Sequence, residues 1–287
     1  MRATSDAART RFSSATASAM RRISSQPLRF DIGAWSLPHP RKTNGGEDSH
    51  FVSPSSSQTA WLGVADGVSA ANDGGLYAHK LMRHAAELIS TSSDTDPSAI
   101  LQRAWTSAQS IDGRSTACIA SLTGSRLRWV NLGDGGCWIL RRLPSSRLGI
   151  AFKTRPQLWE WNCPLQLGRL DGVELNTPAD ANTGEQALLP GDVVLLATDG
   201  CFDALHPLEV LQLTARDLEA PDVSAMHVAT TLVEMAIELS KDSTRMSPVA
   251  HAMEREGFVA RSRELQDDVT VAVARVLPAG SSERFAL

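Results

Sequence analysis

Five segments far apart in the sequence each combine a short apolar or β-prone run with an acidic residue at one end. A carboxylate at the end of a buried strand is costly unless it is paired with, or bound to, a cation. The pattern therefore favours a fold that gathers these acids around a cation. The acids are Glu47 and Asp48 at the start of 48–52, Asp66 after 61–65, Asp134 after 127–132, Asp199 after 193–198, and Asp267 before 269–276.

The order of the expected elements is not that of a doubly wound parallel sheet. Hydrophobic periodicity predicts strands at 30–36, 61–65, 116–122, 127–132, 137–141, 193–198 and 269–276, and helices at 75–90, 97–110 and 224–240. Residues 143–182 contain scattered Gly and Pro and are expected to form irregular loops. Strands, two helices, more strands, helices and a last strand favour an α+β sandwich in which helix pairs cover antiparallel sheets.

Composition and charge narrow the class of protein. The 287 residues are 42% hydrophobic and 21% charged, which is ordinary for a globular chain. The longest aliphatic stretch, 193–197, is far shorter than the roughly 20 residues of a membrane-spanning helix, so no membrane insertion is expected. The net charge is −4, and the first 29 residues carry six arginines against one acid, so the remainder is at −9. An acidic body argues against nucleic-acid binding.

The first 29 residues differ from the rest of the chain. They are rich in Arg, Ser, Thr and Ala and lack a long apolar core, which is typical of an organellar transit peptide, while a plain disordered tail is the alternative. Mitochondrial targeting is favoured over plastid targeting, with a cytoplasmic protein as the remaining possibility. The chain is thus divided into a leader at 1–29, a folded domain at 30–277 and a C-terminal tail at 278–287.

The strand-end acids predict a site for hard divalent cations. With Asp203, one helical turn after Asp199, seven carboxylates face no matching set of Lys or Arg. All-oxygen ligation favours Mg²⁺ or Mn²⁺ over zinc. Two such ions about 3.5–4 Å apart are a general design for phosphoryl hydrolysis. The alternative for any single Asp-Gly pair is a simple turn. The four cysteines show no zinc-binding spacing and are expected to be free thiols.

Six ordered motifs resemble the metal-dependent serine/threonine protein phosphatases of the type 2C (PPM) family. Such a series is far more specific than a single motif. The motifs span about residues 30–277 and are Gly46–Phe51, Gly63–Val68, Gly113–Ala117, Asn131–Gly135, Leu195–Asp203 and Asp267–Val271. The resemblance and the element order together predict a four-layer α-β-β-α sandwich with two central antiparallel sheets.

The resemblance also implies roles for individual residues. Asp66 would bridge two metal ions, Gly67 would offer its carbonyl oxygen, and Asp199 and Asp267 would complete the carboxylates of the first ion. Glu47 and Asp48 would hold metal-bound water, so that Asp66, Glu47 and Asp199 support catalysis. Asp134 and Asp203 match acids that bind a third ion in some members. A hydroxide bridging the two ions would attack phosphorus in line.

Two departures from the family pattern matter for catalysis. Many members have a His after Asp66-Gly67 as a general acid, but Val68 stands here. The Arg that binds substrate phosphate in many members would fall on Thr43, and Arg41 and Lys42 lie nearby as substitutes. These departures, with Gly45–Asp48 and Ser247-Pro248, resemble a mitochondrial branch of the family.

The predicted function is hydrolysis of phosphoserine and phosphothreonine in phosphoprotein substrates, by a chain that resembles monomeric enzymes. The alternatives are a catalytically weak or inactive relative that binds metal and regulates a phosphoprotein partner, and a hydrolase of small phosphate esters. Trp159 and Trp161 alternate within the irregular region, where they either shield the edge of the core or line a substrate groove.

Overall fold

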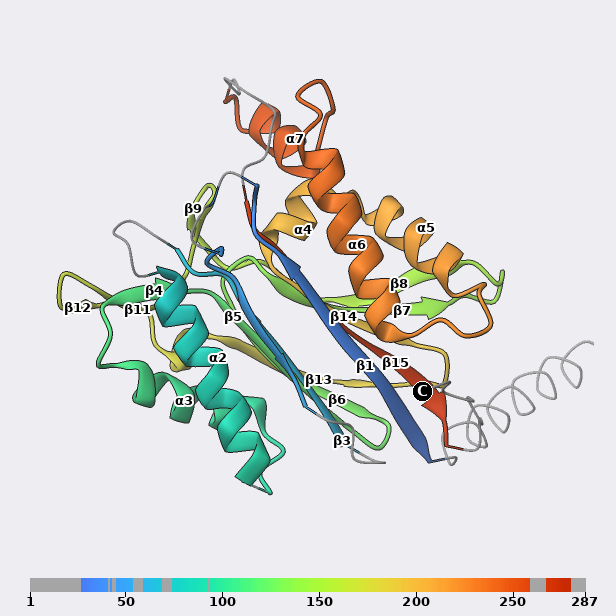
Figure 1. Cartoon of the computed structure of the whole chain (residues 1–287), viewed down its shortest axis with the longest axis horizontal. Helices are drawn as coiled ribbons and strands as arrows, with labels where there is room; N and C mark the ends of the chain where they lie inside the picture. Colours follow the sequence, from blue (N-terminus) through green and yellow to red (C-terminus); the bar gives the residue numbers. More distant parts are fainter. Residues whose placement is uncertain are drawn as a thin grey trace, which may run out of the picture.

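The computed structural model describes residues 27–40, 42, 45–53, 59–68, 74–91, 93–258 and 267–279. The leader up to residue 26, Arg41, Thr43 and the tail from residue 280 lie outside these ranges. The described residues form an α-β-β-α sandwich, so the predicted fold class is confirmed (Figure 1).

Two antiparallel five-stranded sheets form the two central layers. The first sheet has the order β1-β15-β14-β7-β8, and the second has the order β13-β6-β5-β3-β2. The strands of the first sheet are β1 (Leu28–Leu37), β15 (Val269–Pro278), β14 (Val193–Ala197), β7 (Gly136–Arg142) and β8 (Leu148–Lys153). Those of the second are β13 (Asn182–Ala187), β6 (Arg126–Leu132), β5 (Ala117–Thr123), β3 (Thr59–Ala65) and β2 (Ser49–Val52).

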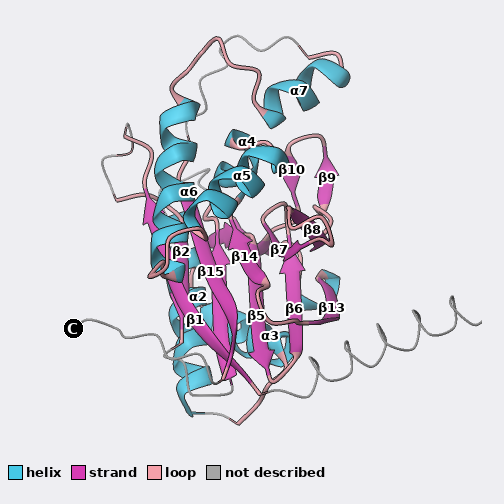
Figure 2. Cartoon of the chain, turned by 90° about the vertical axis from the view of Figure 1, so that its right-hand side faces the viewer, coloured by secondary structure: helices cyan, strands magenta, loops and turns pink. Residues whose placement is uncertain are grey.

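Helices cover the outer face of each sheet (Figures 1 and 2). The second sheet packs against α2 (Gly74–Thr91) and α3 (Pro97–Ala108), and the first packs against α4 (Asp199–Ala204), α5 (Pro207–Asp217) and α6 (Ala225–Ser240). The short helix α7 (Pro248–Arg255) lies at one end of the sandwich. No helix in the described ranges has the length and apolarity needed to cross a membrane.

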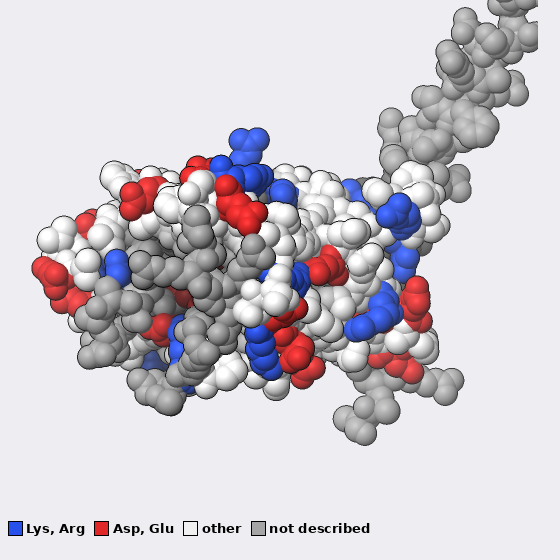
Figure 3. All heavy atoms as spheres, turned by 90° about the horizontal axis from the view of Figure 1, so that it is seen from above, with Lys and Arg blue, Asp and Glu red and all other residues white. Residues whose placement is uncertain are grey.

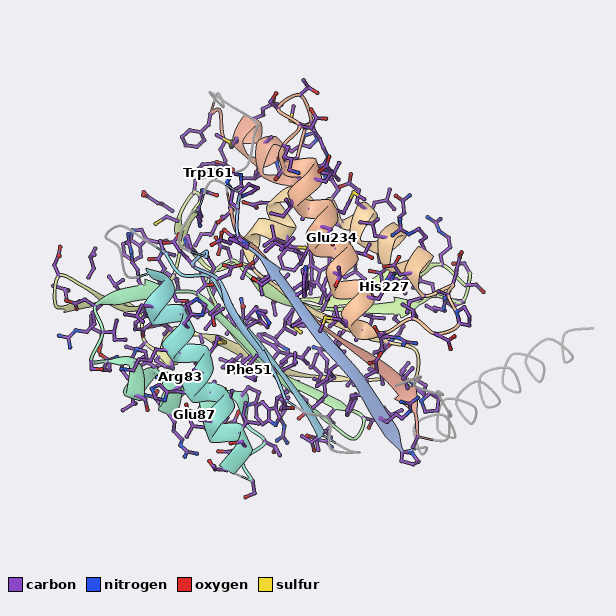
Figure 4. All side chains as sticks on the ribbon, viewed as in Figure 1. Phe51, Arg83, Glu87, Trp161, His227 and Glu234 are labelled. Atoms are coloured by element: carbon purple, nitrogen blue, oxygen red, sulfur yellow. The ribbon has the colours of Figure 1, made fainter. Side chains whose placement is uncertain are left out.

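Three apolar clusters hold the layers together. One fills the space between the sheets, and the other two lie between each sheet and its helices. The helices are amphipathic, as a surface layer requires. Exposed charged residues, including Arg83 and Glu87 on α2 and Glu234 on α6, mark the outer faces of the helices (Figure 4). Leu76 is exposed, whereas its neighbour Tyr77 is buried.

The expectation that residues 143–182 are irregular was wrong. This region supplies β8 to the first sheet, a hairpin of β9 (Leu158–Glu160) and β10 (Cys163–Pro164), and β11 (Leu167–Leu170), which pairs with β12 (Val173–Glu174) and β4 (Gly113–Ser115). The alternation of Leu148, Ile150 and Phe152 was a usable signal for β8. The other strands have two to four residues each, too few for a hydrophobic period to emerge.

Candidate metal centre

The acid-bearing ends of the two sheets face a common pocket of about 370 Å³. The second sheet contributes residues next to β2 and β3, while the first contributes residues next to β14 and β15. The acids that line the pocket are Glu47, Asp66, Asp134, Asp199 and Asp267, and Gly67 lies among them. Asp203 lines an adjoining pocket that shares Asp134 and Asp199. The structure thus brings together acids from segments as much as 220 residues apart.

Burial and mutual repulsion raise the pKa values of the six aspartates of this site. Burial is the largest cause in each case, and neighbouring carboxylates add to it. The pKa of Asp48 rises to about 7, that of Asp203 to about 7 and that of Asp134 to about 6. The pKa values of Asp66 and Asp199 rise well above the usual range, and that of Asp267 also rises. Each acid senses the others, so they form one electrostatic cluster.

Several oxygens in the cluster have no protein partner. Within the described part of the chain, Asp48 Oδ1, Asp134 Oδ1 and Asp199 Oδ1 are shielded from solvent and accept no hydrogen bond. A buried carboxylate oxygen without a donor carries its full desolvation cost. Three such oxygens from three segments indicate that a ligand of positive charge completes the site.

Hydrogen bonds to Thr116 and Glu47 hold the Asp66-Gly67 pair in place. The Asp66 amide donates to Thr116 Oγ1 at 3.1 Å, and the Thr116 amide donates to the Asp66 carbonyl oxygen at 2.9 Å. The Gly67 amide donates to the Glu47 carbonyl oxygen at 3.2 Å. Asp66-Gly67 is therefore an anchored connection between β3 and its neighbours, and not the isolated turn that the dipeptide alone allows.

Thr198 links the acids of the two sheets. Its hydroxyl donates to Asp48 Oδ2 at 2.8 Å and accepts from the Thr270 amide at 3.1 Å. Asp48 precedes β2 in the second sheet, whereas Thr198 and Thr270 belong to the first. The hydroxyl therefore fixes Asp48 Oδ2, whereas Asp48 Oδ1 accepts no hydrogen bond from the described residues.

Asp199-Gly200 opens the helix α4. A side chain at position 200 would collide with the Asp268 carbonyl oxygen, so glycine allows α4 to approach the start of β15. Asp203 follows Asp199 by four residues and lies on the same face of the helix. The predicted one-turn relation between Asp199 and Asp203 is present in the structure.

Asp268 was missed by the sequence analysis, which assigned a role only to Asp267. Its side chain is 1% exposed and accepts from the His39 amide at 2.9 Å and the Glu47 amide at 2.6 Å. Asp268 therefore organises the loop that carries Glu47. The adjacent acids at 267 and 268 were the available signal, but the sequence does not show that the two point to different partners.

Lys42 lies at the site, but its ammonium is already engaged. Nζ is 2.8 Å from Glu47 Oε2, 3.0 Å from Asp268 Oδ2 and 3.6 Å from Asp267 Oδ1. Burial by itself would lower the pKa of Lys42, but its hydrogen bonds to Glu47 and Asp268 outweigh burial and raise it. Lys42 thus neutralises part of the acidic cluster.

Arg114 is a second cation on the pocket wall, and the sequence analysis did not weigh it. Its carbonyl oxygen accepts from the Val68 amide at 2.9 Å, which places it beside Asp66-Gly67-Val68. Among the residues described, no hydrogen-bond partner is present for Arg114 Nε. The signal was the Arg of the Gly113–Ala117 motif.

The carboxylates fit a hydrated cation better than a closed protein cage. No group of three or more His, Cys, Asp or Glu side chains in the described ranges is arranged to hold a metal ion by itself. Mg²⁺ keeps several waters and takes one or two carboxylates together with substrate phosphate. Unpartnered oxygens around an open pocket match that requirement, and the absence of His and of clustered Cys disfavours zinc.

Comparisons with known proteins identify the family. No family model matches the chain. It is 31% identical to probable protein phosphatase 2C 26 of Arabidopsis thaliana, over 88% of this chain and 87% of that one. It is 33% identical to protein phosphatase PTC7 homolog fig of Drosophila ananassae, over 80% of this chain and 73% of that one. Probable protein phosphatase 2C 55 of Arabidopsis thaliana is 32% identical over 89% of this chain, which spans 53% of that relative.

Solved structures share the fold. The X-ray structure of the photosystem II phosphatase PBCP superposes with a TM-score of 0.74 at 28% identity, covering 86% of this chain and 98% of that one. The catalytic domain of the serine/threonine protein phosphatase PstP, in complex with two manganese ions, superposes with a TM-score of 0.60 at 20% identity. The match covers 87% of this chain and 99% of that one. The fold and these relatives together define an α-β-β-α sandwich of the type found in protein phosphatases. The chain belongs to the protein phosphatase 2C family.

Proposed function

We propose that the protein hydrolyses phosphoserine and phosphothreonine side chains of phosphoproteins with the help of divalent cations, Mg²⁺ or Mn²⁺. The observation that carries the proposal is the convergence of buried, unpartnered carboxylate oxygens on one open pocket. Family membership supports it, as does the name of PstP, a serine/threonine phosphatase whose structure contains manganese.

Two ions would be held by the residues on either side of the pocket, and a third is possible at Asp134 and Asp203. Asp66, the Gly67 carbonyl oxygen, Asp199 and Asp267 would contact the two ions, and Glu47 and Asp48 would hold their waters. When bound, such ions lower the pKa of a coordinated water and neutralise the charge of a transferring phosphoryl group. Thr198 keeps Asp48 in place, and Asp268 keeps the Glu47 loop in place.

Substrate phosphate needs a cation that the acids have not already engaged. Arg114 meets this condition, and its planar guanidinium suits a phosphate. Lys42 would contribute as a point charge, although three carboxylates share it. Arg41 stays a sequence-based proposal. Val68 cannot donate a proton, so the leaving alkoxide has no general acid at this position.

The second candidate is a catalytically weak relative that binds metal and regulates a phosphoprotein partner. Val68 on the pocket wall and the engagement of Lys42 by acids favour it. A positioned general acid is worth about 10²–10⁴-fold, so its loss alone is enough to make an enzyme slow.

The test is release of phosphate from a phosphothreonine peptide in the presence of Mn²⁺. We expect turnover by the wild type, abolition by chelator, and loss in Asp66→Asn. Asp112→Asn, which removes an exposed acid outside the cluster, is the matched control and should keep full activity. A folded protein that binds Mn²⁺ but releases no phosphate would favour the regulatory relative.

We also infer mitochondrial targeting from the leader and a monomeric state from the resemblance. A fluorescent protein fused to residues 1–29 should enter mitochondria, whereas plastid or cytoplasmic fluorescence would contradict the first inference. A mass of 30.8 kDa in light scattering supports the second.

A further inference from the structure

A second pocket adjoins the metal centre. It has a volume of about 540 Å³ and shares Asp134, Asn162 and Asp199 with the acid-lined pocket. It extends between the β9–β10 hairpin and α7, which are neighbours at one end of the molecule in both views (Figures 1 and 2). These three residues therefore border both the metal centre and the second pocket, which we name the side groove.

The floor and walls of the side groove are rich in aromatic and apolar side chains. On the floor, Trp138 stacks on Phe202 with ring centroids 4.5 Å apart and an angle of 8° between the planes. On the wall, Trp161 stacks against Phe258 at 4.7 Å. Trp161 lies at the end of the molecule near β9 and α7 (Figure 4). Leu158 lines the rim and is 46% exposed. Exposed apolar groups around a groove are typical of a binding surface.

The charges of the side groove away from the metal centre are mainly positive. Lys153, Arg155 and Arg255 line it, and none forms an ion pair with another residue in the described ranges. Lys153 Nζ lies 5.8 Å from the Trp138 ring centroid. Glu256 is the one lining acid outside the acidic cluster. Both signs of charge are present on the face seen from above (Figure 3).

We propose that the side groove binds the polypeptide flanking the phosphorylated residue and selects segments that combine an apolar side chain with acidic ones. This inference rests on the proposed function. The groove continues the catalytic pocket, its aromatic lining suits an apolar side chain, and its cations suit carboxylates. Residues 1–26 are a poor occupant, because their five arginines and single acid give them the same sign of charge as the groove.

The experiment compares a small ester with peptides. p-Nitrophenyl phosphate probes the metal centre alone, whereas phosphothreonine peptides with an acidic-apolar or a basic flank probe the groove. We expect Trp161→Ala to lower kcat/KM for the acidic-apolar peptide about tenfold, the usual scale for truncating an aromatic anchor, and to leave p-nitrophenyl phosphate within about twofold. Trp159→Ala is the matched control, since Trp159 is 79% exposed on the same hairpin but does not line the groove.

Charge reversal gives a second readout. Arg155→Glu combined with Arg255→Glu should shift the preference from the acidic to the basic peptide, while Arg103→Glu, an exposed residue of α3, should not. Equal losses on peptide and small ester, or equal effects of Trp161→Ala and Trp159→Ala, would overturn the proposal. Tighter peptide binding after removal of residues 1–26 would also overturn it, because the leader would then be the occupant.

Failure of the groove and failure of the proposed function are separable. A wild type inactive on all substrates contradicts the proposed function, and the groove is then tested by fluorescence anisotropy of the labelled acidic-apolar phosphopeptide. Binding weakened by Trp161→Ala and unchanged by Trp159→Ala supports the groove. Absence of wild-type binding refutes it.

Discussion

The two ends of strand β14 carry acids in opposite circumstances. Asp192 precedes the strand, is 1% exposed and accepts from Arg141 Nε and Nη2, each at 2.7 Å. Asp199 follows the strand, and its shielded Oδ1 has no partner among the described residues. Burial raises the pKa of Asp199, and neighbouring carboxylates, among them Asp66 and Asp267, raise it further.

The difference shows that burial alone does not mark a functional acid. At Asp192 the protein supplies its own cation, with a geometry that satisfies both carboxylate oxygens. At Asp199 the described residues supply no cation, so the repulsion from neighbouring carboxylates is not offset. Acids of the first kind stabilise the fold, whereas acids of the second kind reserve a place for a ligand.

The largest effect should come from Asp199→Asn. We expect phosphatase activity to fall by about 10³-fold or more, because metal affinity and charge stabilisation are both lost. The metal-free protein should become more stable, since a buried charge that repels its neighbours is removed. Phosphate release and the melting temperature in chelator measure the two effects. A destabilised Asp199→Asn protein would break the comparison.

Asp192→Asn should have the opposite profile. Loss of one partner of a buried ion pair is expected to cost about 3 kcal/mol of unfolding free energy, with activity per folded molecule unchanged. Denaturant unfolding measures this cost. Glu185→Gln, which breaks the exposed contacts with Arg126 and Arg128, is the control and should cost less than about 1 kcal/mol. Equal costs for the two variants would contradict the distinction.

Arg114→Gln tests an arginine for which the described residues supply no ion-pair partner. We expect kcat/KM to fall about tenfold for peptide and small ester alike, mainly through KM, because a charge-assisted hydrogen bond to phosphate is lost. Arg114→Lys should restore part of the lost kcat/KM. Inhibition by inorganic phosphate should weaken in parallel. An unchanged inhibition constant would remove Arg114 from the phosphate site.

The smallest effect is the pH dependence of the metal-free protein. Because the folded pKa values of Asp48 and Asp203, about 7, exceed the unfolded value of 3.8, the folded state binds more protons. Their stabilising contribution is therefore full below about pH 4 and is lost as pH rises through about 7. We expect the free energy of unfolding, and with it Tm, to fall as pH rises from about 4 to about 7.

Saturating Mn²⁺ provides the control for this pH dependence. The bound ion keeps the carboxylates ionised, so the decline in Tm should flatten, and apparent Mn²⁺ affinity should rise between about pH 6 and 7. A Tm that rises with pH in chelator would mean that the acids are not a repelling cluster.

Much of this arrangement was readable in the sequence. Apolar runs such as 193–198 and the period-2 pattern of 269–276 located β14 and β15, and the acids at their ends were identified as one set. These signals are local, because hydrophobic period and strand termination depend on neighbours in the chain. The same locality explains the failure at 143–182, where most strands have only two to four residues and carry little periodicity of their own.

The strands, and the end of each at which an acid stands, could be predicted from the sequence. Which acids receive a cation could not, because the cation comes from a distant segment. Asp192 stands in a Pro-Gly-Asp turn sequence, which gives no sign that Arg141, 51 residues earlier, neutralises it. Asp268 received no predicted role, yet its carboxylate accepts from the backbone amides of His39 and Glu47. The physical reason is that Coulomb and hydrogen-bond partners are set by distance in space, which the order of residues does not fix.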